Sequence, residues 1–314
     1  MKRKLFSLLL VLVLCMTMCP VVHAAVGDLT MSVILPGNMV VNFSNSKVQC
    51  LTTSGSSYYA YFMYAKFPSD ASLSSVSVSC TFSGTYLKLN GTVVATSSPQ
   101  NVTFDLTTLN TVEVGNNNTS RTYCVAAYKD TFEVKMSFEY ENARTFSTLT
   151  GSTYGNSGML IPVDSAQKQT AATAVAGMDT MCNSMYPTLT PAEYREFDGI
   201  TVTPLSYQPD SYSVYGLMSL FQAGRTNFTF SSTPGSSVHQ IYSIGTLTPD
   251  STGLYYDEDF NHNYGAGGWM YQVVRNGVTY TPLVGTSSWK LFPGDEVIWR
   301  YTCDFGYDIG YPLW

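Results

Sequence analysis

Charge is scarce in this chain, and the acidic residues outnumber the basic ones. Only 12% of the 314 residues are charged, with 16 Lys and Arg against 22 Asp and Glu. Nucleic-acid binding needs a stripe of basic residues that neutralises phosphates, and the sequence has no such stripe. We therefore exclude nucleic acid as a partner. After residue 24 no apolar run is long enough for a membrane-spanning helix, so we expect no membrane insertion of that part.

Histidine is also scarce, which bears on catalysis. Of three histidines, only His239 and His262 lie beyond the N-terminal segment. A hydrolytic triad needs a nucleophile beside a positioned histidine, and no strand-to-helix Gly-x-Ser-x-Gly turn precedes either one. We therefore predict a protein that is not an enzyme, with no catalytic residues and no bound cofactor.

The first 24 residues have the pattern of a secretory signal. A basic start at 2–4 precedes an apolar run from Leu5 to Cys15, and small residues around Ala24 suit cleavage. We expect removal after Ala24 and a secreted protein, extracellular or associated with the cell surface. Three basic residues leave with this segment, so 13 basic and 22 acidic residues remain, for a net charge of about −9.

Five cysteines remain beyond residue 24: Cys50, Cys80, Cys124, Cys182 and Cys303. Export permits disulfides, but an odd count leaves at least one thiol free or paired between molecules. Two readings stay open for the first three: one bridge among them, or free buried thiols. Cys80 shares a strand face with Val76 and Val78, so we expect it to point into a core.

Residues 25–141 read as short strands divided by turns. Apolar and polar residues alternate at 76–82 and again at 132–138, and Asn90-Gly91 marks a hairpin. Regular spacing of such strands predicts an antiparallel β-sandwich of immunoglobulin-like type.

Residues 142–196 combine a linker with helices. The stretch 142–158 is rich in Ser, Thr and Gly and predicts a linker. Asp164 or Ser165 can cap a helix that runs to about Met185. A capping box at 190–193 predicts a short second helix.

Residues 197–314 carry the most specific patterns. Asn276-Gly277 between alternating apolar residues predicts a two-residue hairpin turn, because both central positions need positive φ. The stretch 293–295 predicts a second turn before a strand, in which Val297, Trp299 and Tyr301 share one face.

These patterns, with Gly-Trp-Met-Tyr at 268–271, resemble the transcobalamin-like C-terminal domain over about residues 197–310. This module occurs in many secreted bacterial proteins and in the animal cobalamin carriers. Its other matching pieces are a strand at 200–205, a short helix at 214–223, the stretch 241–245 and the end at 301–310. Many relatives have a cysteine before Gly-Trp-Met-Tyr that would pair with the one at Cys303, and residues 250–267 have none here.

The resemblance implies a β-grasp-like domain, in which a short helix packs on a small mixed sheet. We therefore expect a mainly-β protein with an α+β C-terminal part, and we expect residues 197–314 to fold on their own. Relatives use the module for ligand binding or interaction. In the cobalamin carriers it closes a corrinoid against a helical barrel, which this chain lacks, so cobalamin is one candidate ligand among others.

Aromatic residues near the C-terminus are the candidates for a binding site, because their rings line cores and also stack on flat or sugar-like ligands. We place any site on the loop from Tyr255 to Gly268 and the adjoining strand face, where glycines permit a close approach of the backbone. The candidate residues are Tyr255, Tyr256, Trp269, Tyr271 and Trp289. The alternative is that most of these rings are core, which we favour for Trp299.

Oxygen donors at 257–263 raise the question of calcium. They lack the alternating ligand spacing and central glycine of an EF-hand, so we interpret the stretch as a solvated acidic loop and predict no metal site.

Two functions follow. The first is a secreted, non-enzymatic binding protein for a small molecule, corrinoid or glycan-like, or for a partner protein. The second is an extracellular adhesion or structural protein, whose β domains contact other proteins or glycans. An apolar pocket at the aromatic residues would favour the first, and a flat aromatic patch on a sheet edge would favour the second.

Overall fold

The structure is a computed structural model, and most of the chain after residue 25 is described in it. The described residues are 26–155, 161–188, 196–202, 212–233, 240–252, 254–257, 262–265 and 267–311. For 196–202, 254–257 and 262–265 this holds for the backbone alone. Strands make up 45% and helices 20%, which confirms a mainly-β fold. No helix in the described ranges is long and apolar enough to cross a membrane. The proposed signal segment lies outside them.

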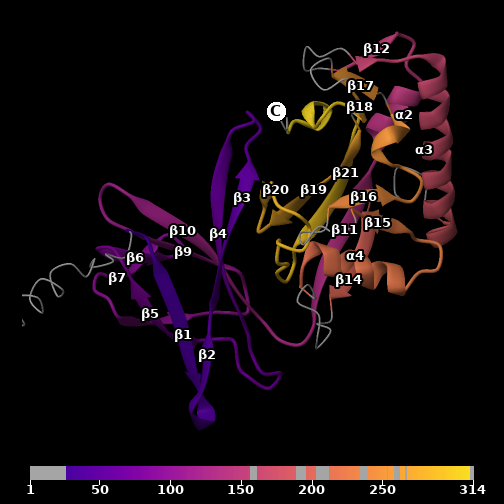
Figure 1. The fold of residues 1–314 in the computed structure, drawn as a ribbon. Coiled ribbons are helices and arrows are strands. Elements are labelled where there is room, and N and C mark those ends of the chain that lie inside the picture. The colour runs from indigo at the N-terminus through magenta and orange to yellow at the C-terminus, as the bar shows by residue number, and fades with distance from the viewer. Residues whose placement is uncertain are drawn as a thin grey trace, which may run out of the picture.

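The N-terminal part is a sandwich of two sheets (Figure 1). One sheet has the order β2-β1-β5-β8, with β1 Leu29–Leu35, β2 Met39–Asn42, β5 Val76–Phe82 and β8 Gln100–Phe104. The other runs β3-β4-β10-β9-β6-β7, with β3 Ser44–Leu51, β4 Ser57–Lys66, β6 Tyr86–Leu89, β7 Thr92–Ala95, β9 Asn110–Gly115 and β10 Ser120–Tyr128. Cys80 is fully buried between the sheets, as predicted. Asn90 and Gly91 have positive φ and join β6 to β7.

The C-terminal part is a mixed sheet with the order β14-β11-β21-β19-β20. Its strands are β11 Phe132–Glu139, β14 Glu196–Val202, β19 Gly268–Arg275, β20 Val278–Pro282 and β21 Glu296–Thr302. Asn276 and Gly277 make the predicted hairpin turn, both at positive φ. The buried face of β21 holds Val297, Trp299 and Tyr301, as their alternation predicts. Helix α4 Val214–Ala223 packs on this sheet, with the Phe221 ring 6.2 Å from Phe138.

The expected boundary between the sandwich, 25–141, and the C-terminal domain, 197–314, does not match these pairings. Strand β11 was assigned to the sandwich, yet it lies inside the C-terminal sheet, parallel to β21 and antiparallel to β14. Alternation along a strand shows which face is buried but not which neighbour pairs with it. Residues 197–314 alone would therefore lack an internal strand of their sheet.

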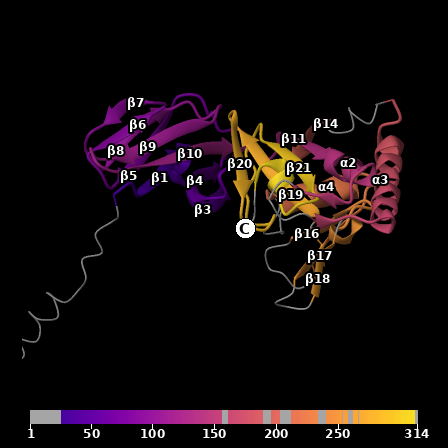
Figure 2. The ribbon, with the colours of Figure 1, turned by 90° about the horizontal axis from the view of Figure 1, so that it is seen from above.

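The two sheets that meet at β20 and β3 form one continuous sheet (Figure 2). Thr281 of β20 pairs with Leu51 of β3, and Pro282 pairs with Cys50. One residue further, the Leu283 N–H donates to the Gln49 carbonyl at 2.8 Å. The sandwich and the C-terminal part thus share a backbone ladder as well as side-chain contacts.

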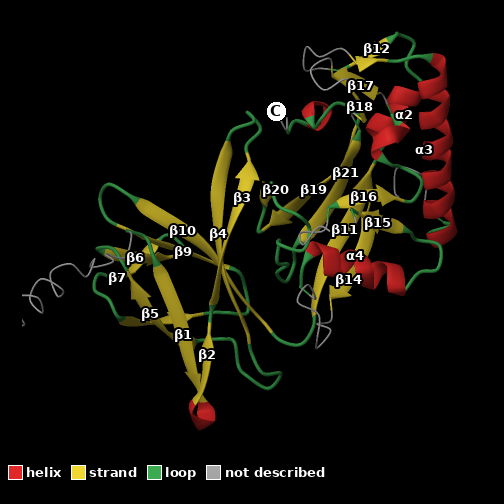
Figure 3. Ribbon diagram, viewed as in Figure 1, coloured by secondary structure: helices red, strands yellow, loops and turns green. Residues whose placement is uncertain are grey.

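The α-helices all accompany the C-terminal sheet within the described residues (Figure 3). Helix α3 Ser165–Met185 begins as predicted, with Asp164 and Gln167 forming a capping box. The linker expected at 142–158 is partly wrong, because α2 Glu141–Ser147 occupies its start and buries Ala143 and Phe146. The short strand β12 Thr153–Tyr154 then pairs with β13 Ile161–Pro162. The second helix expected at 190–193 lies outside the described residues.

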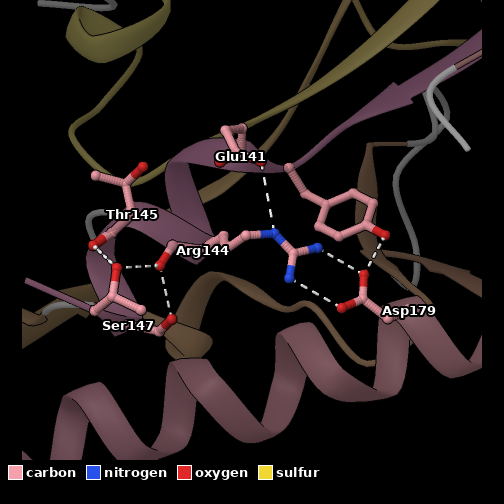
Figure 4. Close-up of polar contacts among 7 residues, drawn as sticks. Glu141, Arg144, Thr145, Ser147 and Asp179 are labelled. Carbon is pink, nitrogen blue, oxygen red and sulfur yellow. Dashed lines mark hydrogen bonds and ion pairs between the residues drawn. The ribbon is translucent and has the colours of Figure 1, made fainter. Parts of the chain in front are cut away.

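An ion pair joins α2 to α3 (Figure 4). Arg144 donates to both carboxylate oxygens of Asp179, at 3.0 and 2.7 Å, and the Tyr140 hydroxyl donates to the same carboxylate at 2.7 Å. Burial alone would raise the pKa of Asp179, but the hydrogen bonds from Arg144 and Tyr140 outweigh it and lower that pKa. Both partners are about one-third exposed, so the pair orients the helices and contributes modestly to stability.

A second ion pair is fully buried where the sandwich meets the C-terminal sheet. Arg275 donates through Nε and Nη2 to Asp295, at 2.8 and 2.7 Å, and the two side chains are 1% and 0% exposed. The guanidinium lies 3.6 Å from the ring centroid of Phe292 and 4.6 Å from that of Phe62 on β4. Burial raises the pKa of Asp295, and the charge of Arg275 offsets part of that rise. We call this junction the seam.

All five described cysteines are free, so the reading with buried thiols holds and the bridge among Cys50, Cys80 and Cys124 is wrong. Cys50 pairs with Tyr58 and Cys124 with Phe62, on opposite sides of β4. Two strand spacings, about 10 Å, separate the strands of these cysteines, and a disulfide bridges Cα atoms less than about 7 Å apart. Cys80 belongs to the sandwich core instead. Burial raises the pKa of Cys50 and Cys80 to about 12, which leaves both as unreactive thiols.

The position of β11 generates a prediction about fragments. Residues 197–314 alone are expected to show no cooperative thermal unfolding, because β21 loses its parallel neighbour and α4 loses its contact with Phe138. The chain from residue 25 to 314 is the control and should unfold cooperatively. A sigmoidal melt of the fragment, followed by circular dichroism, would show that β11 is dispensable.

The seam generates a second prediction. Arg275→Met leaves the Asp295 carboxylate buried without its counter-charge, and should lower the free energy of unfolding by roughly 3–5 kcal/mol. Arg144→Met is the matched control, since its ion pair is partly exposed and should cost about 1 kcal/mol or less. Urea denaturation measures both. Equal, small losses in the free energy of unfolding would mean that the buried pair stabilises the protein no more than the partly exposed one.

Candidate functional site

A pocket of about 370 Å³ opens on the buried face of the C-terminal sheet, near its junction with the sandwich. We call it the aromatic pocket. Its walls come from β16 Ile241–Ile244, β19, β21 and the segment 282–286. The volume lies toward the lower end of the range for small-molecule sites, which is roughly 300–1,000 Å³. Its lining includes Ile241, Tyr242, Trp269, Tyr271, Val284 and Trp299.

Strand register brings the aromatic residues of the pocket together. Trp299 of β21 lies opposite Phe138 of β11 on one side and opposite Tyr271 of β19 on the other. The rings of Tyr271 and Trp299 are 5.6 Å apart at an angle of 45°. Cross-strand neighbours share one face of a sheet, so these residues form a continuous aromatic surface.

Two polar atoms on this surface already have partners in the protein. The indole N–H of Trp269 donates to the Leu247 carbonyl at 3.1 Å, and the Tyr271 hydroxyl donates to the Val284 carbonyl at 2.9 Å. Burial raises the pKa of Tyr271 well above its usual value, so the hydroxyl stays protonated and remains a donor. The first bond holds Leu247 against β19, and the second holds the segment 282–286 against the same strand.

Trp299 differs from its neighbours. Its side chain is 1% exposed, and its indole Nε1 has no hydrogen-bond partner among the described residues. Most buried donors in proteins are paired, because an unpaired one loses its hydration without compensation. The indole Nε1 is itself closed off from solvent, so this unpaired donor lies within the packing around Trp299 and does not face the open pocket.

Among the described residues that line the aromatic pocket, none is Asp, Glu, Lys, Arg, His or Cys. At the rim of the pocket, the Tyr242 hydroxyl donates to Asp250 at 3.1 Å. That hydrogen bond raises the pKa of Tyr242. No group of three or more potential metal-ligating side chains occurs among the described residues. The described lining therefore offers apolar walls and hydrogen-bonding groups.

The predicted site residues divide into three groups. Trp269 and Tyr271 line the aromatic pocket, and they are 9% and 7% exposed. Trp289 does not line it; this residue lies at the seam, fully buried, with its ring 5.0 Å from Phe62. Tyr255 and Tyr256 belong to a described strand, but their side chains lie outside the described part.

The long loop expected from Tyr255 to Gly268 is a hairpin instead. Strand β17 Leu254–Asp257 pairs with β18 His262–Gly265, with Tyr255 opposite Tyr264 and Asp257 opposite His262. The residues between these strands lie outside the described part. Strand β18 contacts the 3₁₀ turn η3 Pro249–Ser251, and Pro249 lines the aromatic pocket. The hairpin is thus connected to the pocket through η3.

The backbone at Gly267 does come close to other atoms, and these atoms belong to the protein itself. A Cβ at this position would collide with Thr252, with the Tyr301 hydroxyl and with the Pro249 carbonyl. Glycine is required there so that the start of β19 can pack against η3. Protein atoms therefore occupy the space at Gly267 that we expected a bound group to use.

Sequence reasoning missed the far walls of the pocket. Ile241 and Tyr242 belong to a stretch that matched the resembled family, but nothing in their spacing shows that they face β19. The segment 282–286 carries no motif. Trp299 was correctly predicted as core, and the missing partner of its indole N–H depends on the tertiary structure.

The chain was compared with family models, with curated proteins and with solved structures. None of the three comparisons found a match.

Proposed function

We propose that this protein is a secreted, non-enzymatic binding protein that holds a small ligand in the aromatic pocket. The observation that carries the proposal is a pocket of about 370 Å³ walled by Trp269, Tyr271 and Trp299. Concave, mostly apolar sites with a few polar groups are the usual form of small-molecule sites. Export is supported by the signal pattern at residues 1–24, and binding of a neutral molecule by the uncharged side chains among the described lining residues.

The resemblance to the transcobalamin-like domain supports the same function. The mixed sheet and the short helix packed on it are the features that this resemblance implies. A corrinoid consists of a macrocycle with several side chains and exceeds what this pocket can enclose. Among the ligands considered, the size of the pocket favours a smaller, glycan-like molecule, and leaves a corrinoid only an edge contact.

Filling the pocket tests the proposal. Val284 is half-buried and lines the pocket, so Val284→Trp places a large ring in its wall. The matched control is Val278→Trp, on an exposed residue of β20 that does not line the pocket. The ligand panel contains corrinoids, soluble glycans and neutral small molecules, and calorimetry measures binding.

We expect at least one member of the panel to bind the native protein. Val284→Trp should weaken that binding at least tenfold, and Val278→Trp should leave it unchanged, with similar melting temperatures for both. Binding that survives Val284→Trp would place the ligand elsewhere. A native protein that binds no member of the panel, and no fragment in a broader screen of the pocket by NMR, would contradict the proposal.

A second function, adhesion, is favoured by one surface. At the tip of the β1–β2 hairpin, Ile34 and Val40 lie opposite each other and are 70% and 56% exposed, with Met39 beside them. The chain has no charged residue between Asp28 and Lys47. Exposed apolar surface of this kind marks interaction sites. If adhesion is the function, Ile34→Ser with Val40→Ser should abolish attachment of the labelled protein to the cells that secrete it, whereas Val93→Ser on β7 should not. Equal attachment by both variants would reject it.

A further inference from the structure

We propose that the aromatic pocket binds a short, extended peptide, which pairs its backbone with the open edge of β19. This inference rests on the proposed function, because it names the class of ligand for the same pocket. Three features of the structure lead to it: the early end of the ladder between β19 and β20, the direction of the backbone groups beyond that end, and the position of the pocket along the same edge.

Strand β19 has a full neighbour on one side and a partial neighbour on the other. Its pairing with β21 begins at Gly268, whereas its pairing with β20 stops at Val273 and Tyr280. Beyond this point β20 pairs with β3 of the sandwich. Pro282 stands where the next hydrogen-bonded partner of β19 would be, and proline has no N–H to donate. In the described ladders, residues 268–272 therefore form an open edge on the side away from β21.

The backbone groups along this edge point into the opening. The Asn-Gly turn makes Arg275 and Val278 a hydrogen-bonded pair, so the N–H and C=O of Arg275 point toward β20. This direction repeats at every second residue of a strand, so the backbone groups of Tyr271 and Trp269 share it. Neither the described ladders nor the described turns and loops supply a partner for these four groups. Donors and acceptors that repeat about 7 Å apart match the backbone of an extended peptide.

The pocket lies along the same edge. Trp269 and Tyr271 project from one face of β19 and Met270 from the other, and all three line the pocket. An opening bordered by both faces follows the edge of the strand. Gly268 also lines the pocket, is half-buried and has open space where a Cβ would stand, so the main chain itself borders the opening there. A strand edge with open backbone groups is a template on which another strand can pair.

Strand geometry also predicts the pattern of the peptide. Side chains of an added strand alternate between the two faces of the sheet. Every second side chain therefore lies on the aromatic surface beside Trp269 and Tyr271, with Val284 in the wall of the same pocket. Apolar side chains suit this place, because they leave water on binding. The open edge at 268–272 matches a peptide of about five residues with apolar residues at alternate positions.

Hydrogen exchange of the native protein tests the open edge before any peptide is added. The full chain from residue 25 is labelled with ¹⁵N, and amide exchange is followed by NMR. The amides of Met270 and Gln272 point toward β21 and are the internal controls, since both should exchange slowly. We expect the amides of Trp269 and Tyr271 to exchange at least about tenfold faster. Equal protection of all four amides would show that the chain itself already pairs at this edge, and would overturn the inference.

Capped pentapeptides test the pairing itself. Their pattern is apolar-Ser-apolar-Ser-apolar, with Val, Leu or Tyr as the apolar residue. Each is made in three forms: unmodified, N-methylated at the apolar residues, and N-methylated at the serines. The N–H groups of an extended peptide point to its two edges in turn, so only one methylated form loses the N–H groups that pair with β19.

Calorimetry measures the affinity of each form. We expect at least one unmodified peptide to bind, one of its methylated forms to bind at least about tenfold more weakly, and the other to keep its affinity. The unmodified peptide should also slow the exchange of the Trp269 and Tyr271 amides and leave those of Met270 and Gln272 unchanged.

The outcomes separate this inference from the proposed function. If a peptide binds and its two methylated forms bind equally, strand addition is wrong, and the proposed function stands when Val284→Trp weakens that peptide. The same conclusion follows if a peptide binds and the exchange of the Trp269 and Tyr271 amides does not change. If no peptide binds, the inference is overturned. A ligand from the wider panel that Val284→Trp weakens would still support the proposed function.

Discussion

The buried ion pair between Arg275 and Asp295 is the constraint on which the rest of this structure depends. Arg275 ends β19 and Asp295 precedes β21, so the pair joins two adjacent strands of the C-terminal sheet at their ends. The two side chains also hold the segment that leads into β21, because Arg275 donates to the Lys290 carbonyl and Asp295 accepts from the Phe292 N–H. The rings around the guanidinium come from both parts of the protein, which ties the sandwich to the sheet.

The aromatic pocket depends on this seam. Its wall at 282–286 follows β20 directly, and β20 is the strand that pairs with β3 of the sandwich. The wall is held from one side by the bond from Leu283 to Gln49, and from the other by the bond from Tyr271 to Val284. A pocket whose described walls all come from the C-terminal part is therefore shaped by contacts with the N-terminal sandwich. A buried ion pair is seldom the most stabilising choice for such a junction, but it fixes one arrangement, because any other would leave a charge buried and alone.

The local elements were largely predictable from sequence, for physical reasons. Asn276-Gly277 and Asn90-Gly91 need positive φ, Asp164 caps α3, and the alternation at Val297, Trp299 and Tyr301 reports a buried face. Each of these signals is local. The pairing of strands is not a local property. Strand β11 has the alternation of any half-buried strand, and nothing in its sequence identifies β21 as its neighbour. The same limit applies to the site, since Trp269 and Tyr271 were found from their strand, whereas the position of Val284 depends on contacts between distant segments.

We infer that the sandwich and the C-terminal sheet unfold as one cooperative unit, joined at the seam. Differential scanning calorimetry of the chain from residue 25 measures how many units unfold. We predict a single transition whose calorimetric enthalpy equals its van't Hoff enthalpy, as expected when all parts unfold together. Two resolved transitions, one for the sandwich and one for the C-terminal sheet, would contradict the claim and would separate the aromatic pocket from the N-terminal part.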